Sequence, residues 1–182
     1  MKALTASVLF YTTLVLSCTL PVAQGRNGAQ FATALEYNNY IIERQAGVIN
    51  HILSISKSAE TDLEITEHLL NKGVALADSI LADVKGLSDY KGDSALRNTA
   101  VAMFSFYRKV FDGDYREMIA IRKKGDNITG EDLLRLQQIQ QDLQQEESER
   151  DKRFHNAQQD FAERNNLRLG DNSLQKKIDG IE

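Results

Sequence analysis

The chain contains a single proline, Pro21, so the long stretch after it lacks the residue that most strongly interrupts a helix. Gln, Glu, Leu, Ala and Arg are frequent, which is typical of helical bundles rather than of β-sheets. A chain of 182 residues has the length of one domain with a substantial core. We therefore expect a single all-α domain.

The segment Asp93–Lys124 is predicted to be the central helix, because its apolar residues recur at alternating steps of three and four. It is the most aromatic segment, and aromatic side chains bury the largest area per residue. Its stripe consists of Leu96, Thr99 and Ala100, Met103, Phe106 and Tyr107, Val110 and Phe111, Tyr115, Met118 and Ile121. Gly113 lies between two aspartates and costs about 1 kcal/mol in a helix interior, so a kink or a tight packing point is expected there.

Three further amphipathic segments need a partner for their own apolar stripes, namely residues 29–56, 61–87 and 129–169. Together with the central helix they predict an elongated antiparallel four-helix bundle over residues 29–169. The break near residues 57–62 is interpreted as a turn, with Thr61 and Glu64 at the spacing of a capping box. One continuous bent helix is the alternative, because no Gly or Pro forces a turn there.

Single residues add detail to this bundle. Gly73 allows another helix to approach closely, and Thr129 is predicted to cap the last helix. The tail, residues 170–182, carries the apolar residues Leu174, Ile178 and Ile181 and could form a short helix.

Residues 1–25 have the features of a signal peptide. Lys2 precedes an apolar run of roughly fourteen residues, which suits a signal sequence and is too short to span a bilayer comfortably. If Val15–Cys18 is a lipoprotein box, Cys18 becomes the acylated first residue, although the bulky Leu16 fits such a box poorly. Alternatively, cleavage follows Ala23–Gly25, and Cys18 is a chance thiol discarded with the leader. The lipoprotein interpretation is slightly favoured, because the chain's single Cys lies at the end of the apolar run.

Four polar residues lie on the apolar faces of the first and last helices: Asn38, Gln45, Glu147 and Arg150. If these helices are antiparallel neighbours, counting from their ends places Gln45 near Glu147 and predicts a polar layer in mid-bundle. Such a layer could fix the register of the helices or line a ligand pocket. The preferred alternative is that the last helix leaves the seam there and both charges are solvated, because buried charges are expensive.

The sequence offers little catalytic chemistry. The three histidines, His51, His68 and His155, lack the paired Glu-x-x-His units of carboxylate-bridged metal bundles. Glu64 and His68 lie four residues apart but have no further ligands in sequence. No nucleophile elbow, phosphate loop or dinucleotide fingerprint occurs. A net charge of −4 does not favour nucleic acid. We expect no enzyme activity, no metal, no cofactor and no nucleic-acid partner.

Several stretches resemble a family of bacterial surface proteins, often predicted lipoproteins, whose molecular function is unassigned. The resemblance covers about residues 30 to 169 and is carried by Glu36–Gln45, Gly92–Arg97, Phe104–Phe111 and Phe161–Leu169. It implies a helical domain in the cell envelope, at the outer surface or in the periplasm, and supplies no catalytic residue.

Two function hypotheses follow. The first is an exported, lipid-anchored protein that binds an envelope or surface protein. The second is a small-ligand binder with a polar pocket around Asn38, Gln45, Glu147 and Arg150.

Overall fold

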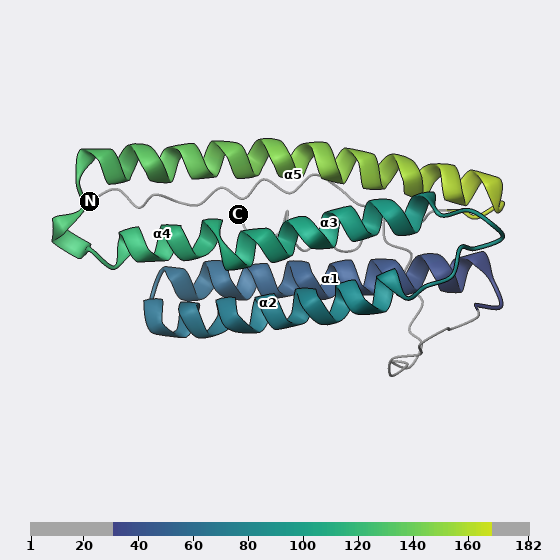
Figure 1. The fold of residues 1–182 in the computed structure, drawn as a ribbon, viewed down its shortest axis with the longest axis horizontal. Helices are drawn as coiled ribbons and strands as arrows, with labels where there is room; N and C mark the ends of the chain where they lie inside the picture. The colour runs from purple at the N-terminus through teal and green to yellow at the C-terminus, as the bar shows by residue number, and fades with distance from the viewer. Residues whose placement is uncertain (1–30, 169–182) are drawn as a thin grey trace.

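The computed structural model of the protein describes residues 31–168, which form an elongated bundle of helices (Figure 1). The helices are α1 (Ala34–Ala59), α2 (Leu63–Lys85), α3 (Ala95–Asp112), α4 (Asp114–Arg122) and α5 (Gly130–Arg164), with a 3₁₀ turn η1 (Gly125–Asn127) before α5. Because α4 continues the line of α3, the bundle has four antiparallel rods. The predicted all-α four-helix bundle is confirmed. The signal peptide and most of the tail lie outside the described residues.

The predicted central helix lies at the centre of the packing. Helix α3 packs against α2 and α5 most extensively and also touches α1, whereas α1 packs chiefly against α2. Phe104 and Phe111 on α3 are fully buried, and Phe106 and Tyr107 are nearly so. The buried aromatic side chains of α3 therefore hold the other rods against it, as the apolar stripe of Asp93–Lys124 predicts.

At Gly73, α2 approaches two neighbouring helices closely. A Cβ atom at this position would lie 3.0 Å from Cγ of Phe111 on α3 and 3.1 Å from Nε2 of His51 on α1. The His51 ring is itself fixed, because its Nε2 lies 2.8 Å from the carbonyl oxygen of Leu69. The expected close contact at Gly73 is therefore present, and it involves three helices at once.

The turn between α1 and α2 differs in detail from the sequence prediction. Asp62, rather than Thr61, is the N-cap of α2, and its carboxylate accepts hydrogen bonds from the backbone N–H groups of Glu64 and Ile65. The predicted capping box of Thr61 and Glu64 is therefore wrong by one residue. The reason is tertiary: the hydroxyl groups of Ser58 and Thr66 lie 2.9 Å apart in the buried side of the turn, which fixes where α2 begins. A turn separates two helices here, and the single bent helix is excluded.

Thr129 caps α5 as predicted. Its hydroxyl oxygen accepts a hydrogen bond from the backbone N–H of Asp132, and the Asp132 carboxylate accepts one from the N–H of Thr129. This reciprocal capping box satisfies two backbone donors that the first helical turn leaves free. Lys124 adds an ion pair to Asp132, which lowers the pKa of that carboxyl to about 2.

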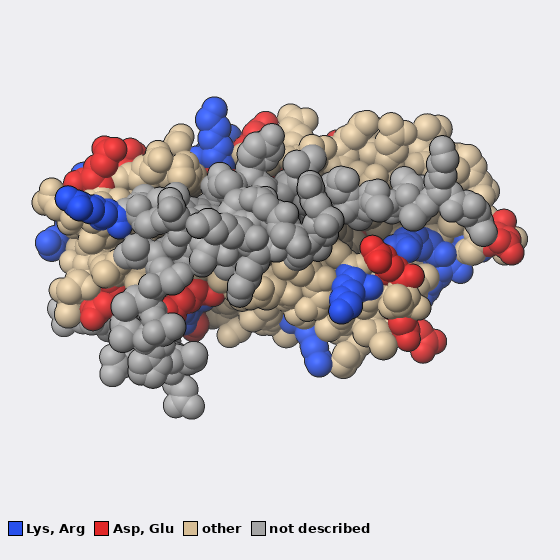
Figure 2. Space-filling model, turned by 180° about the vertical axis from the view of Figure 1, so that it is seen from behind, with Lys and Arg blue, Asp and Glu red and all other residues tan. Residues whose placement is uncertain are grey.

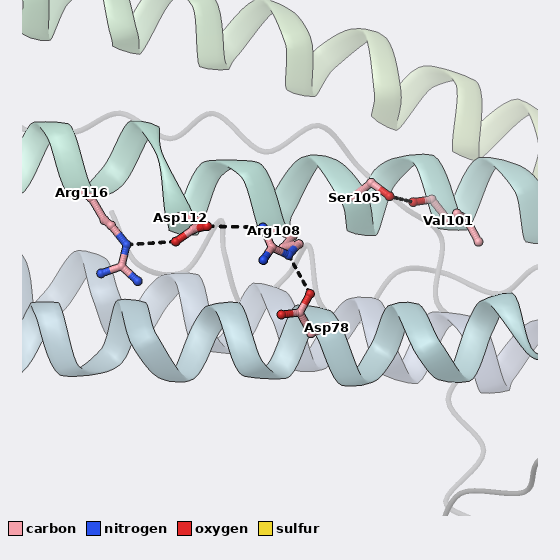
Figure 3. A network of polar contacts seen from close by, with 6 residues as sticks. All are labelled: Asp78, Val101, Ser105, Arg108, Asp112 and Arg116. Atoms are coloured by element: carbon pink, nitrogen blue, oxygen red, sulfur yellow. Dashed lines mark hydrogen bonds and ion pairs between the residues drawn. The ribbon is translucent and has the colours of Figure 1, made fainter.

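The third rod breaks at Gly113, where the sequence predicts a weak point. Gly113 leaves the helical conformation, with φ of −121° and ψ of −85°, and separates α3 from α4. An ion pair bridges the break (Figure 3): Asp112 at the end of α3 pairs with Arg116 of α4 at 3.3 Å, and it also pairs with Arg108 of α3 at 3.3 Å. Arg108 also binds Asp78 on α2 at 2.6 Å. The network therefore holds both halves of the rod in line against α2.

Helix α5 ends in a Schellman motif. Asn166 takes the left-handed conformation with φ of 53°. The N–H of Asn166 donates to the carbonyl of Glu163 at 3.2 Å, and the N–H of Leu167 donates to that of Ala162 at 2.8 Å. Leu167 then packs against the core. The motif satisfies two of the last carbonyl groups of α5 that have no partner within the helix.

The face of the described bundle seen in Figure 2 carries charges of both signs. Its visible basic and acidic side chains are interspersed rather than gathered into one patch. Within residues 31–168, no helix combines the length and the apolar character needed to cross a bilayer. The large apolar side chains that are exposed are Ile65, Leu133 and Leu134.

Candidate functional site

Asn38 lies fully buried near the start of α1 and contacts the end of α5. Its Oδ1 accepts a hydrogen bond from Nε2 of Gln158 at 3.1 Å, and its Nδ2 lies 3.4 Å from Oδ1 of Asn39. Next to this pair, the rings of Tyr37 and Phe161 stack at 5.6 Å. The buried amides therefore join α1 and α5 at one end of the bundle, where aromatic packing excludes water.

Gln45 lies two turns farther along α1 and is also buried. Its Nε2 is 3.7 Å from Sδ of Met103 on α3, a weak hydrogen bond, and its buried Oε1 has no hydrogen-bond partner within residues 31–168. A buried amide oxygen without a partner costs about 1–3 kcal/mol. Gln45 is thus directed toward α3 and is only partly satisfied.

Glu147 lies in mid-α5 and is half-buried, one turn before Asp151 on the same face. Burial, together with the negative charge of Asp151, raises the pKa of Glu147 to about 7. Burial likewise raises the pKa of Asp151 to about 7. Both carboxylates lie close enough to the buried phenol of Tyr107 to raise its pKa further above the ordinary value. Burial raises the pKa of Tyr115 of α4, and the negative charge of Glu147 adds to this increase. The site is therefore a half-buried acidic pair beside the buried phenol of Tyr107 and the partly buried phenol of Tyr115.

Arg150 has different neighbours from Glu147. Its guanidinium lies 5.1 Å from the ring centroid of Phe106 and forms an ion pair with Glu146 at 3.4 Å. Glu146 also receives Lys109 of α3 at 3.0 Å. The charge of Arg150 is therefore balanced by Glu146 and not by Glu147.

The four residues of the predicted polar layer thus have separate partners. Asn38 binds Gln158, Gln45 contacts Met103, Glu147 neighbours Asp151, and Arg150 pairs with Glu146. Among the described residues no hydrogen bond or ion pair joins any two of the four. The reason is that α5 packs on α3, while α1 and α5 are not a closely packed pair of helices along their length.

We call the side of the bundle between α1 and α5 the open edge. It is bordered by Gln45 on α1 and by Glu147, Asp151 and His155 on α5. Sequence reasoning did not single out Gln158 or Asp151. The spacing could have indicated them, because Asp151 follows Glu147 by four residues and Gln158 follows Phe154 by four.

A separate hollow of about 270 Å³ lies on the surface between α5 and the junction of α3 with α4. It is lined by Lys109, Asp114, Asp142, Leu143, Gln145 and Glu146. Burial raises the pKa of Asp114, and no described residue forms a hydrogen bond with its Oδ2. The hollow is charged and contains none of the four residues of the predicted polar layer.

Metal-ligating side chains do not converge within residues 31–168, where no group of three or more His, Cys, Asp or Glu is placed to hold an ion. Glu64 and His68 both lie on the exposed face of α2. Cys18, the predicted lipidation site, lies outside the described residues.

Comparison with protein-family models, with curated proteins and with solved structures finds no match to this chain.

Proposed function

We propose that this protein is exported to the bacterial cell envelope, is anchored there by a lipid on Cys18, and acts by binding a surface or envelope protein. The observation that carries the proposal is the leader, in which a basic residue and an apolar run end at the single Cys. Between Cys18 and Phe31 the chain has thirteen residue steps, which reach at most about 45 Å. Such a tether keeps the bundle close to the membrane.

The orientation of the bundle supports a binding role at its far end. Helix α1 begins at one end of the bundle, whereas α2 and α5 both begin at the opposite end (Figure 1). The exposed apolar residues lie in the first turns of those two helices: Ile65 is 53% exposed, Leu133 48% and Leu134 68%. A chain anchored before α1 therefore presents these side chains away from the anchor, where a partner can reach them.

The anchor is tested by intact mass and membrane partitioning of the protein from its native host. Cys18→Ala is compared with the matched control Ser17→Ala, which keeps a small residue before the cysteine. We expect the wild type and the control to begin at Cys18, carry acyl groups and partition into membranes, and the Cys18→Ala variant to lose all three properties. A soluble species beginning near Arg26, unaffected by the change at Cys18, overturns the anchor.

The binding end is tested by cross-linking in the native envelope. The double variant Leu133→Ser with Leu134→Ser removes the exposed apolar pair at the start of α5. Its control, Gln137→Ser with Gln138→Ser, alters exposed residues one turn later on the same helix. Loss of a cross-linked adduct in the first variant alone supports the proposal, and equal adducts in both contradict it.

A further inference from the structure

The open edge between α1 and α5 is the least closely packed side of the bundle. Helix pairs α1 and α2, α2 and α3, and α3 and α5 pack extensively, while α1 and α5 meet only near Asn38 and Gln158. A four-rod bundle with all sides closed would pack α1 against α5 throughout. One side therefore lacks a helix-to-helix contact along most of its length.

A polar stripe of α5 borders this edge. Gln158 donates to Asn38, so the face of α5 that carries Gln158 is turned toward α1. His155, Asp151 and Glu147 precede it by three, seven and eleven residues, which places them on the same helical face. The Nδ1 atom of His155 is buried and has no hydrogen-bond partner among the described residues. The stripe thus includes a buried ring nitrogen, Nδ1 of His155, for which residues 31–168 provide no hydrogen bond.

The acidic pair on this stripe lacks a cation. Burial raises the pKa of both Glu147 and Asp151, and no basic side chain among residues 31–168 offsets that effect. Two desolvated carboxylates four residues apart on one helix also repel each other. A pair of positive charges beside the two carboxylates would offset both their desolvation and their mutual repulsion.

The chain supplies such charges just beyond α5. Residues 171–182 lie outside the described part, but their sequence has Leu174, Ile178 and Ile181 at helical spacing, with Lys176 and Lys177 between them. The Schellman motif at Asn166 ends α5, and Leu167 directly after it packs against the core. The tail therefore follows a residue that lies on the core, and it carries the complementary charge.

The distances agree with this placement. Helix α5 ends at Arg164, about 20 Å along the helix axis from Asp151. From Arg168, five extended residues would reach roughly 17 Å and four helical residues a further 6 Å, or about 23 Å to Lys177. The tail is therefore long enough for Lys177 to lie beside Asp151.

We propose that residues 171–182 dock along the open edge, with Lys176 and Lys177 beside Glu147 and Asp151 and the apolar residues of the tail against the bundle. In this arrangement the tail packs between α1 and α5, where these two helices do not pack against each other. This inference concerns the folded chain alone and does not depend on export or on the lipid anchor.

Amide hydrogen exchange of the mature chain tests the docking. We expect the amides of residues 174–181 to exchange on the order of tenfold or more slowly than in a peptide of the same sequence. The double variant Glu147→Lys with Asp151→Lys is expected to return them to the peptide rate. Adding Lys176→Glu and Lys177→Glu to that variant is expected to restore slow exchange, because the charges are again complementary.

The control is Glu149→Lys with Glu163→Lys, which makes the same change of charge at exposed positions of α5. It should leave the tail protected. Amides of α3 report whether each variant still folds, so a loss confined to the tail is local. Peptide-like exchange of the tail in the wild type overturns the inference. Protection that survives the charge reversal, or that depends on protein concentration as for a second copy, also overturns it.

Discussion

Replacement of Gly73 by alanine separates two opposing effects at one position. Alanine is favoured over glycine in a helix interior by about 1 kcal/mol, so helix propensity alone predicts a more stable protein. The new methyl group, however, would lie 3.0 Å from Phe111 and 3.1 Å from His51. Phe111 is fully buried and the His51 ring is held by the Leu69 carbonyl, so neither neighbour can move away freely.

Gly47 provides the matched control. It lies in the interior of α1 and is exposed, and no atom lies within 4 Å of the place that a Cβ would take. Gly47→Ala therefore gains the propensity term alone and should raise the free energy of unfolding by about 1 kcal/mol. The difference between the changes in unfolding free energy of the two variants cancels the propensity contribution and leaves the cost of overpacking at Gly73, about 1–3 kcal/mol. We expect a net loss of about 1 kcal/mol for Gly73→Ala.

Urea unfolding followed by far-ultraviolet circular dichroism measures both changes. Phe111→Leu provides a further check, because a smaller side chain should relieve the contact with the new methyl group. In a double-mutant cycle, the cost of Gly73→Ala should fall by about 1 kcal/mol in the Phe111→Leu background. If Gly73→Ala stabilises the protein as much as Gly47→Ala does, the close approach of three helices at Gly73 is not as the structure has it.

Three further perturbations have defined outcomes. Asn38→Ala should lower the free energy of unfolding by about 1–3 kcal/mol, measured by urea unfolding, because it removes the buried oxygen that Gln158 binds. Asp132 has a folded-state pKa of about 2, below the ordinary 3.8, so its contribution is present above pH about 4 and is lost as the pH falls toward 2. Asp132→Asn should accordingly be less stable than the wild type at neutral pH and equal to it near pH 2 in thermal unfolding; a deficit that persists in acid contradicts this. Arg108→Ala removes the ion pairs that join Arg108 to Asp78 on α2 and to Asp112 just before the break at Gly113, and because this side chain is exposed the loss of stability should be small. Calorimetry at low and at about 1 M salt should show that loss only at low salt.

Local patterns in the sequence correctly predicted the features of the fold that are determined by residues close together in the chain. The stripe of the central helix, the weak point at Gly113 and the cap at Thr129 each depend on residues within one or two turns. The start of α2 was misplaced by one residue, because Thr61 and Asp62 are both good caps and the contact between Ser58 and Thr66 decides between them.

The polar layer required information that periodicity does not contain. The spacing of Asn38, Gln45, Glu147 and Arg150 shows which face of each helix is inward, but not which helix that face meets. Counting from helix ends assumed that the first and last helices are close neighbours throughout. In the structure the hydrogen bond between Asn38 and Gln158 joins residues 120 positions apart and is confined to one end. Only the three-dimensional arrangement of the rods shows whether α1 and α5 meet along their whole length or at one end.

The aromatic and amide contacts at that end have a mechanical consequence. The first turn of α1 and the last turns of α5 meet there, through Tyr37, Phe161 and the pair Asn38 and Gln158, so the bundle is entered and left at the same end (Figure 1). Tension applied between the start of α1 and the end of α5 would therefore load these few contacts first and separate the rods one turn at a time. Such unzipping needs far less force than shearing parallel rods past each other. The fold should accordingly be mechanically weak along this line, even where its thermodynamic stability is high.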